Sequence, residues 1–243
     1  MNVVVTGGGT IAPIDDVRHV ANVSTGRFSA AIAEACLALG ATVWHVHAPS
    51  AVLPFAREAA LDPLAVPDLE FARLAALRLR WLDAKPRLHL VPLPRGTVAD
   101  YAERLAGVLR GAPIDVALLA MAVSDFEPEP LPGKISSATD ELLIRCRPTP
   151  KVIRSVREWS PTTYLVGFKL LSGVSEPELI RAAAEANRVN RADLTVANDL
   201  QALRAGRHTL HLVRPGHEVE TMGPGGSLAK RLVGRVFEWA GMR

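Results

Sequence analysis

The sequence is poor in cysteine and in aromatic residues. Its 243 residues include 2 cysteines, and phenylalanine, tryptophan and tyrosine together make up 5%. Cys36 and Cys146 stand far apart, outside any CxxC or Cys/His pattern, which excludes a disulfide framework and a cysteine zinc site. We expect both thiols to be buried and reduced. The few aromatics argue against a protein that binds single-stranded nucleic acid by stacking.

Long apolar runs and a strong charge bias are also missing. The uncharged apolar runs fall well short of the ~20 residues that a membrane helix needs. The opening MNVVVTGGGT carries no basic segment of a secretory signal. Lys and Arg (28) exceed Asp and Glu (25) by a net charge of +3, and the basic stretch 73–87 reads as a solvated helix face. We therefore expect a cytoplasmic protein that uses small anionic substrates and binds neither nucleic acid nor membrane.

Short β-rich runs alternate with amphipathic helical stretches. This pattern predicts an α/β fold, with a Rossmann-like, open, mostly parallel sheet and helices on both faces. Strands are expected at 2–6, 41–47, 115–123, near 141–145, at 163–168 and 193–197, and a hairpin at 208–213 and 217–221. Helices are expected at 27–39, 68–83, 97–110 (with Thr97 as N-cap), near 149–158, at 175–189 and at 227–240.

The chain is predicted to be a single domain over residues 1–243, without repeats or a low-complexity linker. Residues 50–95, rich in Leu, Ala and Arg, are expected to form a helical insertion, and a small hairpin or this insertion to serve dimerisation. Residues 124–136 contain several prolines and a glycine, and we expect them to lack regular structure.

Glycines and small polar residues follow the first expected strand in two turns. The glycines at 7–9 let backbone N–H groups approach a ligand closely. They fit the dinucleotide pattern G-x-G-x-x-A, but Pro13 follows at once and the next helix begins only near Gly26. A second turn at 22–26 leads into that helix and predicts an anion site, although a plain helix cap is the alternative. Two adjacent anion sites suit a triphosphate, or a nucleotide phosphate beside a phosphorylated substrate.

Charged and aromatic residues stand at the carboxyl ends of other strands, where open α/β sheets bind ligands. Asp125 follows the most apolar strand and is suited to a ribose hydroxyl or to Mg²⁺. Lys134 lies in a loop able to fold over a ligand and to neutralise phosphate charge. Phe168 suits a nucleotide base, and Lys169 adds a charge at the same edge. The alternatives are that Asp125 is a turn residue, Lys134 a solvated surface lysine and Phe168 a core aromatic.

Six blocks of sequence, taken in order, resemble one known family. They are VVVTGGGTIAPIDDVRHVANVSTG at 3–26, AMAVSDFEP at 120–128, KISS at 134–137, PTPKVIRSVREWSP at 148–161, YLVGFKLL at 164–171 and ADLTVANDL at 192–200. The family is phosphopantothenate–cysteine ligase (phosphopantothenoylcysteine synthetase), in its stand-alone form. The resemblance covers nearly the whole chain.

The resemblance implies a two-step ligation in coenzyme A biosynthesis. A nucleoside triphosphate, CTP or ATP, would convert the carboxylate of 4'-phosphopantothenate to an acyl-nucleotidylate, with Mg²⁺ and release of pyrophosphate. The amine of L-cysteine would then displace the nucleoside monophosphate. The family also implies a homodimer. A NAD(P)-binding Rossmann reductase and a non-catalytic nucleotide-binding homologue are the alternative functions.

The resemblance also implies roles for individual residues. Asn22 and Lys134 would be catalytic, and Asn22 and Asn198 would bind substrate. The nucleotide would be bound by Gly7, Gly8, Gly9, Ser24, Thr25, Gly26, Leu119, Ala120, Met121, Asp125, Lys134, Pro150, Lys151, Val152, Ile153, Phe168 and Lys169. Mg²⁺ would bind through the nucleotide phosphates, with Asp125 as the candidate protein ligand. Two further family lysines fall near Ala186 and Asn190, so Lys169 or Arg188 is the candidate for that charge.

Overall fold

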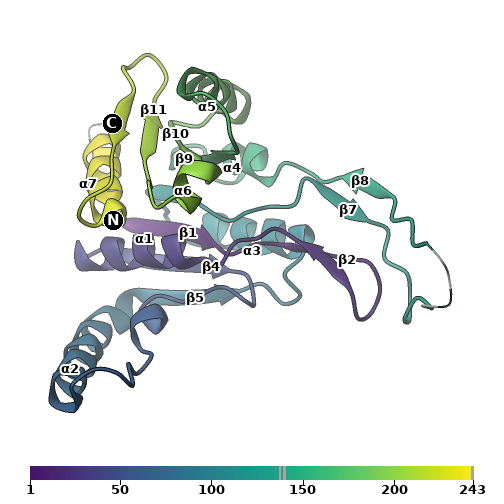
Figure 1. Ribbon diagram of the computed structural model, residues 1–243. Coiled ribbons are helices and arrows are strands. Elements are labelled where there is room, and N and C mark those ends of the chain that lie inside the picture. The colour runs from purple at the N-terminus through teal and green to yellow at the C-terminus, as the bar shows by residue number, and fades with distance from the viewer. Residues whose placement is uncertain (137, 139–140, 242–243) are drawn as a thin grey trace.

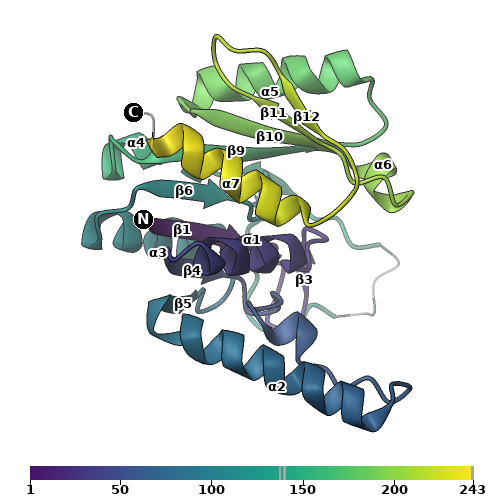
Figure 2. The ribbon, with the colours of Figure 1, turned by 90° about the vertical axis from the view of Figure 1, so that its left-hand side faces the viewer.

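The computed structural model describes residues 1–136, 138 and 141–241 of the chain. Its centre is an eight-stranded sheet in the order β12-β11-β10-β9-β6-β1-β4-β5 (Figures 1 and 2). The strands are β1 (Asn2–Gly7), β4 (Thr42–His47), β5 (Leu88–Pro92), β6 (Val116–Leu119), β9 (Tyr164–Leu171), β10 (Leu194–Asp199), β11 (Leu210–Val213) and β12 (Glu220–Met222). The first six pair in parallel, and β11 and β12 add an antiparallel edge. The predicted Rossmann-like α/β fold is confirmed.

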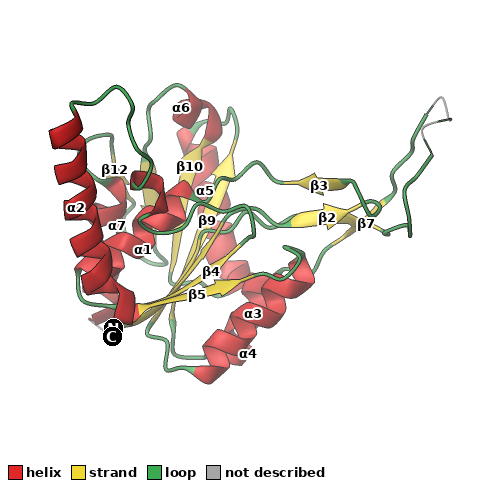
Figure 3. Ribbon diagram, turned by 90° about the horizontal axis from the view of Figure 1, so that it is seen from below, coloured by secondary structure: helices red, strands yellow, loops and turns green. Residues whose placement is uncertain are grey.

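Helices cover both faces of the sheet (Figures 2 and 3). One face packs against α1 (Arg27–Ala38), α2 (Pro67–Ala84) and α7 (Leu228–Gly241). The other packs against α3 (Val98–Gly111), α4 (Val156–Trp159) and α5 (Glu176–Asn190). Val3 and Val5 of β1 join the first apolar layer and Val4 the second, because successive side chains of a strand point to opposite faces. This double burial explains why the parallel strands read as continuous apolar runs.

Most of the expected elements lie within a few residues of their predicted bounds. Thr97 caps α3 in a capping box with Asp100, as predicted for an N-cap. The hairpin expected near 208–221 is the antiparallel pair β11–β12. The elements that were missed include the 3₁₀ turns η1 (Ala56–Glu58) and η2 (Lys85–Arg87), α6 (Leu200–Arg204) and the edge strand β5.

Several predictions were wrong, mostly where elements are too short for a periodic pattern. The strand expected near 141–145 is β8 (Cys146–Pro148), and it pairs with β7 (Phe126–Pro128) inside the segment expected to lack regular structure. Both strands end in proline, which is tolerated because each is an edge strand of a two-stranded sheet. The helix expected near 149–158 is split into the 3₁₀ turn η3 (Val152–Ser155) and α4. The strand expected at 115–123 ends at Leu119.

Two further corrections concern burial and the insertion. Cys146 is exposed, unlike Cys36, because β8 lies outside the main core. Residues 50–95 are not wholly a helical insertion, since they include β5, which forms one edge of the main sheet. The helical part is α2, which buries only Glu70, Leu77 and Ala84.

A small substructure projects from the sheet, and we call it the arm (Figures 1 and 3). It consists of residues 11–21, with the antiparallel pair β2 (Ile11–Pro13) and β3 (His19–Ala21), and the described residues of two further stretches, 126–136 with β7 and 141–148 with β8. Asp15 joins its two parts, because its buried carboxylate accepts a hydrogen bond from the backbone N–H of Ile135 at 3.0 Å. That bond, aided by those from Val17 and Arg18, lowers the pKa of Asp15.

Candidate active site

The two glycine-containing turns lie against each other at the end of β1. A Cβ added to Gly26 would lie 3.2 Å from the backbone nitrogen of Gly8, and one added to Gly9 would lie 2.6 Å from the carbonyl oxygen of Asn22. Gly8 and Gly26 both have positive φ, at 88° and 72°, which favours glycine. The sequence therefore uses glycine here for close approach of two backbones as well as for turn geometry.

The second turn leads directly into α1. Gly26 is the N-cap of this helix, with no side-chain cap and no acidic residue in the first turn. The free N–H groups and the helix dipole make such an end favourable for an anion. Ser24 is half-buried and Thr25 is exposed, whereas the glycines at 7–9 are buried.

A buried histidine lies beneath the first glycine turn. A Cβ on Gly7 would lie 1.8 Å from Oγ of Ser29 and 3.2 Å from Nε2 of His45. His45 is fully buried, and among the described residues neither of its ring nitrogens has a hydrogen-bond partner. Burial, together with neighbouring His47, lowers the pKa of His45 to about 3. The imidazole under the turn is therefore neutral at physiological pH.

A loop from β4 supports both turns. Ala48 donates its backbone N–H to the carbonyl of Gly7 at 3.0 Å, and Val52 donates to Thr25 at 2.9 Å. Glu34 of α1 holds the far end of this loop, accepting from the backbone N–H of Phe55 at 2.8 Å. Phe55 has a positive φ of 67°, a strained conformation for an aromatic residue. The turns are thus held by packing on a tethered loop.

The chain that leaves β6 runs beside the first turn. Thr10 donates its backbone N–H to Ala122 at 3.0 Å, and Ala122 donates to Gly8 at 2.9 Å. The Thr6 hydroxyl accepts from the backbone N–H of Met121 at 3.1 Å. Residues 120–124 therefore connect the glycine turns to what lies on the far side of β6.

That far side is a pocket of about 410 Å³ between the end of β6, η3, the end of β9 and α5. Nine of the predicted nucleotide-binding residues line it: Leu119, Met121, Asp125, Pro150, Lys151, Val152, Ile153, Phe168 and Lys169. They come from three separate blocks of sequence, and the sheet order β9-β6-β1 brings them together. Ala186 and Asn190, where the two family lysines were expected, line it as well.

Aromatic and aliphatic contacts fix the wall of the pocket. Ile153 of η3 packs on β9, where its Cδ1 lies 3.2 Å from the Cβ position of Gly167. Phe168 makes an edge-to-face contact with Phe28 of α1, with ring centroids 6.4 Å apart. Phe168 thus borders the pocket and also touches the helix that starts at the second turn.

Other predicted site residues lie outside the pocket. Asn22 and Lys134 are exposed, Asn22 directly after β3 and Lys134 on the arm, and Asn198 is half-buried at the end of β10. None of the three lines the pocket, nor do Ala120 and the two glycine turns. Ser137 of the KISS block lies outside the described residues. The sequence-based candidates therefore fall into a pocket group, a turn group and an arm group.

Sequence reasoning missed several residues that line the pocket. They are Tyr101, Val123, Ser124, Thr149, Arg154, Ala182, Glu185 and Val189. Arg154 stands in the quoted block 148–161, and the structure places it in the 3₁₀ turn that follows Lys151. The residues from α3 and α5 had no motif that could have found them.

Two carboxylates offer oxygen ligands at the pocket, Asp125 and Glu185. Among residues 1–136, 138 and 141–241, no three His, Cys, Asp or Glu side chains form a group able to hold a metal ion. Mg²⁺ commonly binds through one or two carboxylates together with substrate phosphates, and this donor set fits that mode.

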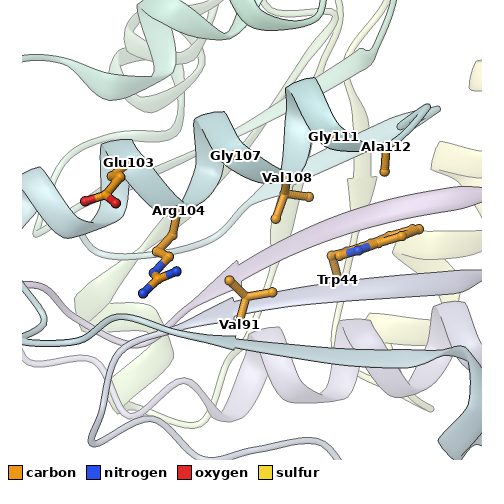
Figure 4. Close-up of a pocket in the computed structure, with 8 residues that line it drawn as sticks. All are labelled: Trp44, Val91, Glu103, Arg104, Gly107, Val108, Gly111 and Ala112. Carbon is orange, nitrogen blue, oxygen red and sulfur yellow. The ribbon is translucent and has the colours of Figure 1, made fainter.

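A second hollow, of about 490 Å³, lies between α3 and strands β4 and β5 (Figure 4). Its lining includes Trp44, Val91, Arg104 and Gly107, and none of the predicted site residues. It is the larger of the two hollows but carries a single acid and a single base, Glu103 and Arg104. The pocket beside η3 is therefore the better candidate for the site.

Comparison with known proteins places the chain in a family. Residues 1–62 and 96–238 match the DNA/pantothenate metabolism flavoprotein C-terminal domain. The chain is 32% identical to the coenzyme A biosynthesis bifunctional protein CoaBC of Thermococcus kodakarensis, over 87% of this chain and 44% of that protein. It is 29% identical to phosphopantothenate–cysteine ligase of Mus musculus, over 84% of this chain and 73% of that protein.

The fold agrees with a solved member. A crystal structure of the DNA/pantothenate metabolism flavoprotein from Streptococcus pneumoniae matches with a TM-score of 0.77 and 26% identity, over 100% of this chain and 99% of that chain. The chain belongs to this family. It spans about half the length, or less, of the bifunctional relatives that it matches. Within the described part of the chain, no helix combines the length and apolarity needed to cross a bilayer.

Proposed function

We propose that this family member is a phosphopantothenate–cysteine ligase of coenzyme A biosynthesis, acting as one domain over residues 1–243. The observation that carries the proposal is the pocket beside η3, lined by nine residues at motif positions and joined to two glycine turns by residues 120–124. The name of the mouse relative supports the same reaction. A NAD(P)-dependent reductase has less support, because the β2–β3 hairpin separates the glycines from α1.

The chemistry requires an inert carboxylate to become an electrophile. One carboxylate oxygen of 4'-phosphopantothenate attacks the α-phosphorus of the nucleoside triphosphate, and the bond from that phosphorus to the bridging oxygen breaks as pyrophosphate leaves. The amine of cysteine then attacks the acyl carbon, the bond from carbon to the phosphate oxygen breaks, and the nucleoside monophosphate leaves with its electron pair. The amine loses a proton to solvent.

The residues divide between binding and catalysis. The pocket would hold the base and ribose, with Phe168 against the base. The backbone N–H groups of the glycine turns would hold phosphate that extends from the pocket. Lys134 would neutralise the α-phosphate as it is attacked, and the Asn22 amide would donate to the mixed anhydride and orient the incoming amine. Asn198 would contact the substrate.

Mg²⁺ and the choice of nucleotide belong to the same proposal. Mg²⁺ would bind the nucleotide phosphates with Asp125 as the protein carboxylate, and it would reduce the negative charge that the pyrophosphate carries away. Both CTP and ATP fit the proposal, because the groups that would face the base are backbone atoms and apolar side chains of residues 119–121 and 168. The choice between them is decided by assay.

Two copies of the chain would pair through the arm. The arm and its root expose large apolar side chains, among them Val17 (61% exposed), Val20, Phe126 and Leu143 (79%). Exposed apolar surface of this kind is typical of protein–protein contacts. The free thiols of Cys36 and Cys146 fit a reducing compartment, and we place the enzyme in the cytoplasm.

The proposal is tested by a product assay. Purified protein is given 4'-phosphopantothenate, L-cysteine and Mg²⁺ with either CTP or ATP, and pyrophosphate and the cysteine conjugate are measured. We expect equal amounts of both products with at least one nucleotide, and none when phosphopantothenate is omitted. Failure to release pyrophosphate with either nucleotide contradicts the proposal. Nucleotide binding without product would identify a non-catalytic homologue instead.

A further inference from the structure

The pocket beside η3 carries more positive charge than its own carboxylates balance. Five charged side chains line it: the carboxylates Asp125 and Glu185, and the cations Lys151, Arg154 and Lys169. The lining alone therefore carries a net charge of +1. Its ion pairs decide which cations remain for a ligand.

Both carboxylates already have a cationic partner. Asp125 forms an ion pair with Lys151 at the pocket. Glu185 pairs with Arg188, which lies one turn along α5 and does not line the pocket, through contacts of 2.6 and 2.9 Å. Arg188 is therefore paired with Glu185. Of Lys169 and Arg188, the two candidates to replace the charge of the family lysines, Lys169 is the one that lines the pocket.

Arg154 and Lys169 are the cations left over. Within the described residues, neither side chain forms an ion pair or a hydrogen bond with another group. Two unpaired cations that line one pocket repel each other in the empty protein, and an anion between them removes that repulsion. Their arrangement favours a ligand with more than one negative charge.

The backbone around both cations is fixed by packing. Arg154 lies in η3, where its backbone N–H donates to the carbonyl of Lys151 at 2.9 Å. Its neighbour Ile153 packs on Gly167, two residues before Lys169 in β9. Lys169 is itself half-buried and paired in register with Ala197 of β10. The contact between η3 and β9 thus holds the two cations on adjoining walls.

We infer that Arg154 and Lys169 together bind the polyphosphate of the nucleoside triphosphate at the mouth of the pocket. This inference rests on the proposed function and adds Arg154 to the residues of its site. The guanidinium offers a planar fork of donors that matches two oxygens of one phosphate, and the ammonium adds a point charge for a neighbouring one. Both cations would thereby favour the triphosphate over the monophosphate product.

The test compares binding of ATP, CTP, AMP and CMP, each with Mg²⁺, by titration calorimetry of the full chain. Arg154→Gln removes the charge, and Arg154→Lys keeps it but loses the fork. Arg181→Gln is the matched control, because Arg181 is an exposed arginine of α5 that does not line the pocket. Melting curves establish that each variant is folded.

We expect Arg154→Gln to weaken triphosphate binding by ~10- to 100-fold, the loss typical of one charged hydrogen-bond pair. Monophosphate binding should change by less than about 3-fold, and Arg154→Lys should fall between Arg154→Gln and wild type. Arg181→Gln should bind both like wild type. Equal triphosphate affinity in Arg154→Gln and wild type overturns the inference, as does an equal loss for monophosphate and triphosphate.

The outcome separates this inference from the proposed function. If the wild-type protein makes the cysteine conjugate and Arg154→Gln has the same KM for the nucleotide, the proposed function is supported and the role of Arg154 is overturned. A wild-type protein that binds triphosphate through Arg154 but makes no conjugate supports the inference and overturns the function. A variant whose KM rises for phosphopantothenate alone would place the cations at the phosphate of that substrate and also overturn the inference.

Discussion

The pocket and the arm differ in how they hold their candidate residues. Most pocket side chains come from β6, η3, β9, α5 and the segments beside them, and Ile153 packs on Gly167 while Phe168 contacts Phe28. The arm and its root carry the two predicted catalytic residues, Lys134 and Asn22, and both are exposed. The pocket is formed within the folded chain, whereas the arm and its root present polar side chains at the surface.

This difference suggests a division of labour. A binding pocket gains from being preorganised, since ordering it on ligand binding would cost affinity. A catalytic group need meet the reacting atoms only after the substrates are bound, and a projecting arm can deliver it as lids and loops do. Arm variants should therefore change kcat and spare nucleotide affinity, and pocket variants should do the reverse.

The largest effect is expected at Asn22. Asn22→Ala removes a donor to the mixed anhydride, and we expect kcat to fall by ~10²- to 10³-fold. Because the side chain is exposed, the melting temperature and the affinity for nucleotide should stay close to those of wild type. Steady-state kinetics and calorimetry on the same preparation measure both. A variant with near wild-type turnover would remove Asn22 from the catalytic residues.

Lys134 should come next. Lys134→Gln removes the charge that stabilises the attacked α-phosphate, so pyrophosphate release in a single turnover should slow by about 10²-fold. Asp15→Asn provides a matched test, because it leaves the lysine in place but weakens the hydrogen bond from neighbouring Ile135. We expect a smaller loss of the same step. Equal rates in all three proteins would show that the arm does not take part in this step.

A third prediction concerns the buried histidine where the arm leaves the sheet. The pKa of His45 is about 3 in the folded protein, against an ordinary value of 6.5. Between these values the unfolded chain binds a proton that the folded chain does not, so stability is complete above pH 6.5 and falls as pH drops. From this group we expect a loss of about 2 kcal/mol between pH 6.5 and pH 5.

Denaturant unfolding at a series of pH values measures that loss. His45→Leu should flatten the dependence over this range, leaving the smaller contribution of His208, whose pKa burial also lowers. An unchanged slope in His45→Leu would mean that His45 is not the group responsible.

The smallest effect is expected at Phe168. Stacking of a base on an aromatic ring contributes ~1–3 kcal/mol, so Phe168→Leu should raise the KM for nucleotide by about 10-fold and leave kcat nearly unchanged. Leucine keeps an apolar contact with Phe28 and limits the loss of stability. A fall in kcat at saturating nucleotide would contradict the assignment of Phe168 to binding alone.

The two regions were also unequally predictable from the sequence. The parallel strands and long helices carry periodic apolar patterns, and strand-end motifs such as 119–125 and 150–153 converge once the sheet order is known. The arm strands have three residues each and follow no period, so β2, β3 and β7 were not recognised and β8 was expected a few residues too early. Arg154 was missed because its availability depends on which carboxylates its neighbours already pair with.

The most direct test of the division between pocket and arm is a single-turnover measurement of pyrophosphate release at rising nucleotide concentration. We predict that saturating nucleotide brings Arg154→Gln to within about 3-fold of the wild-type rate, since its defect lies in binding. The same concentrations should leave Asn22→Ala as slow as before. Rescue of Asn22→Ala by nucleotide, or failure to rescue Arg154→Gln, would contradict the account.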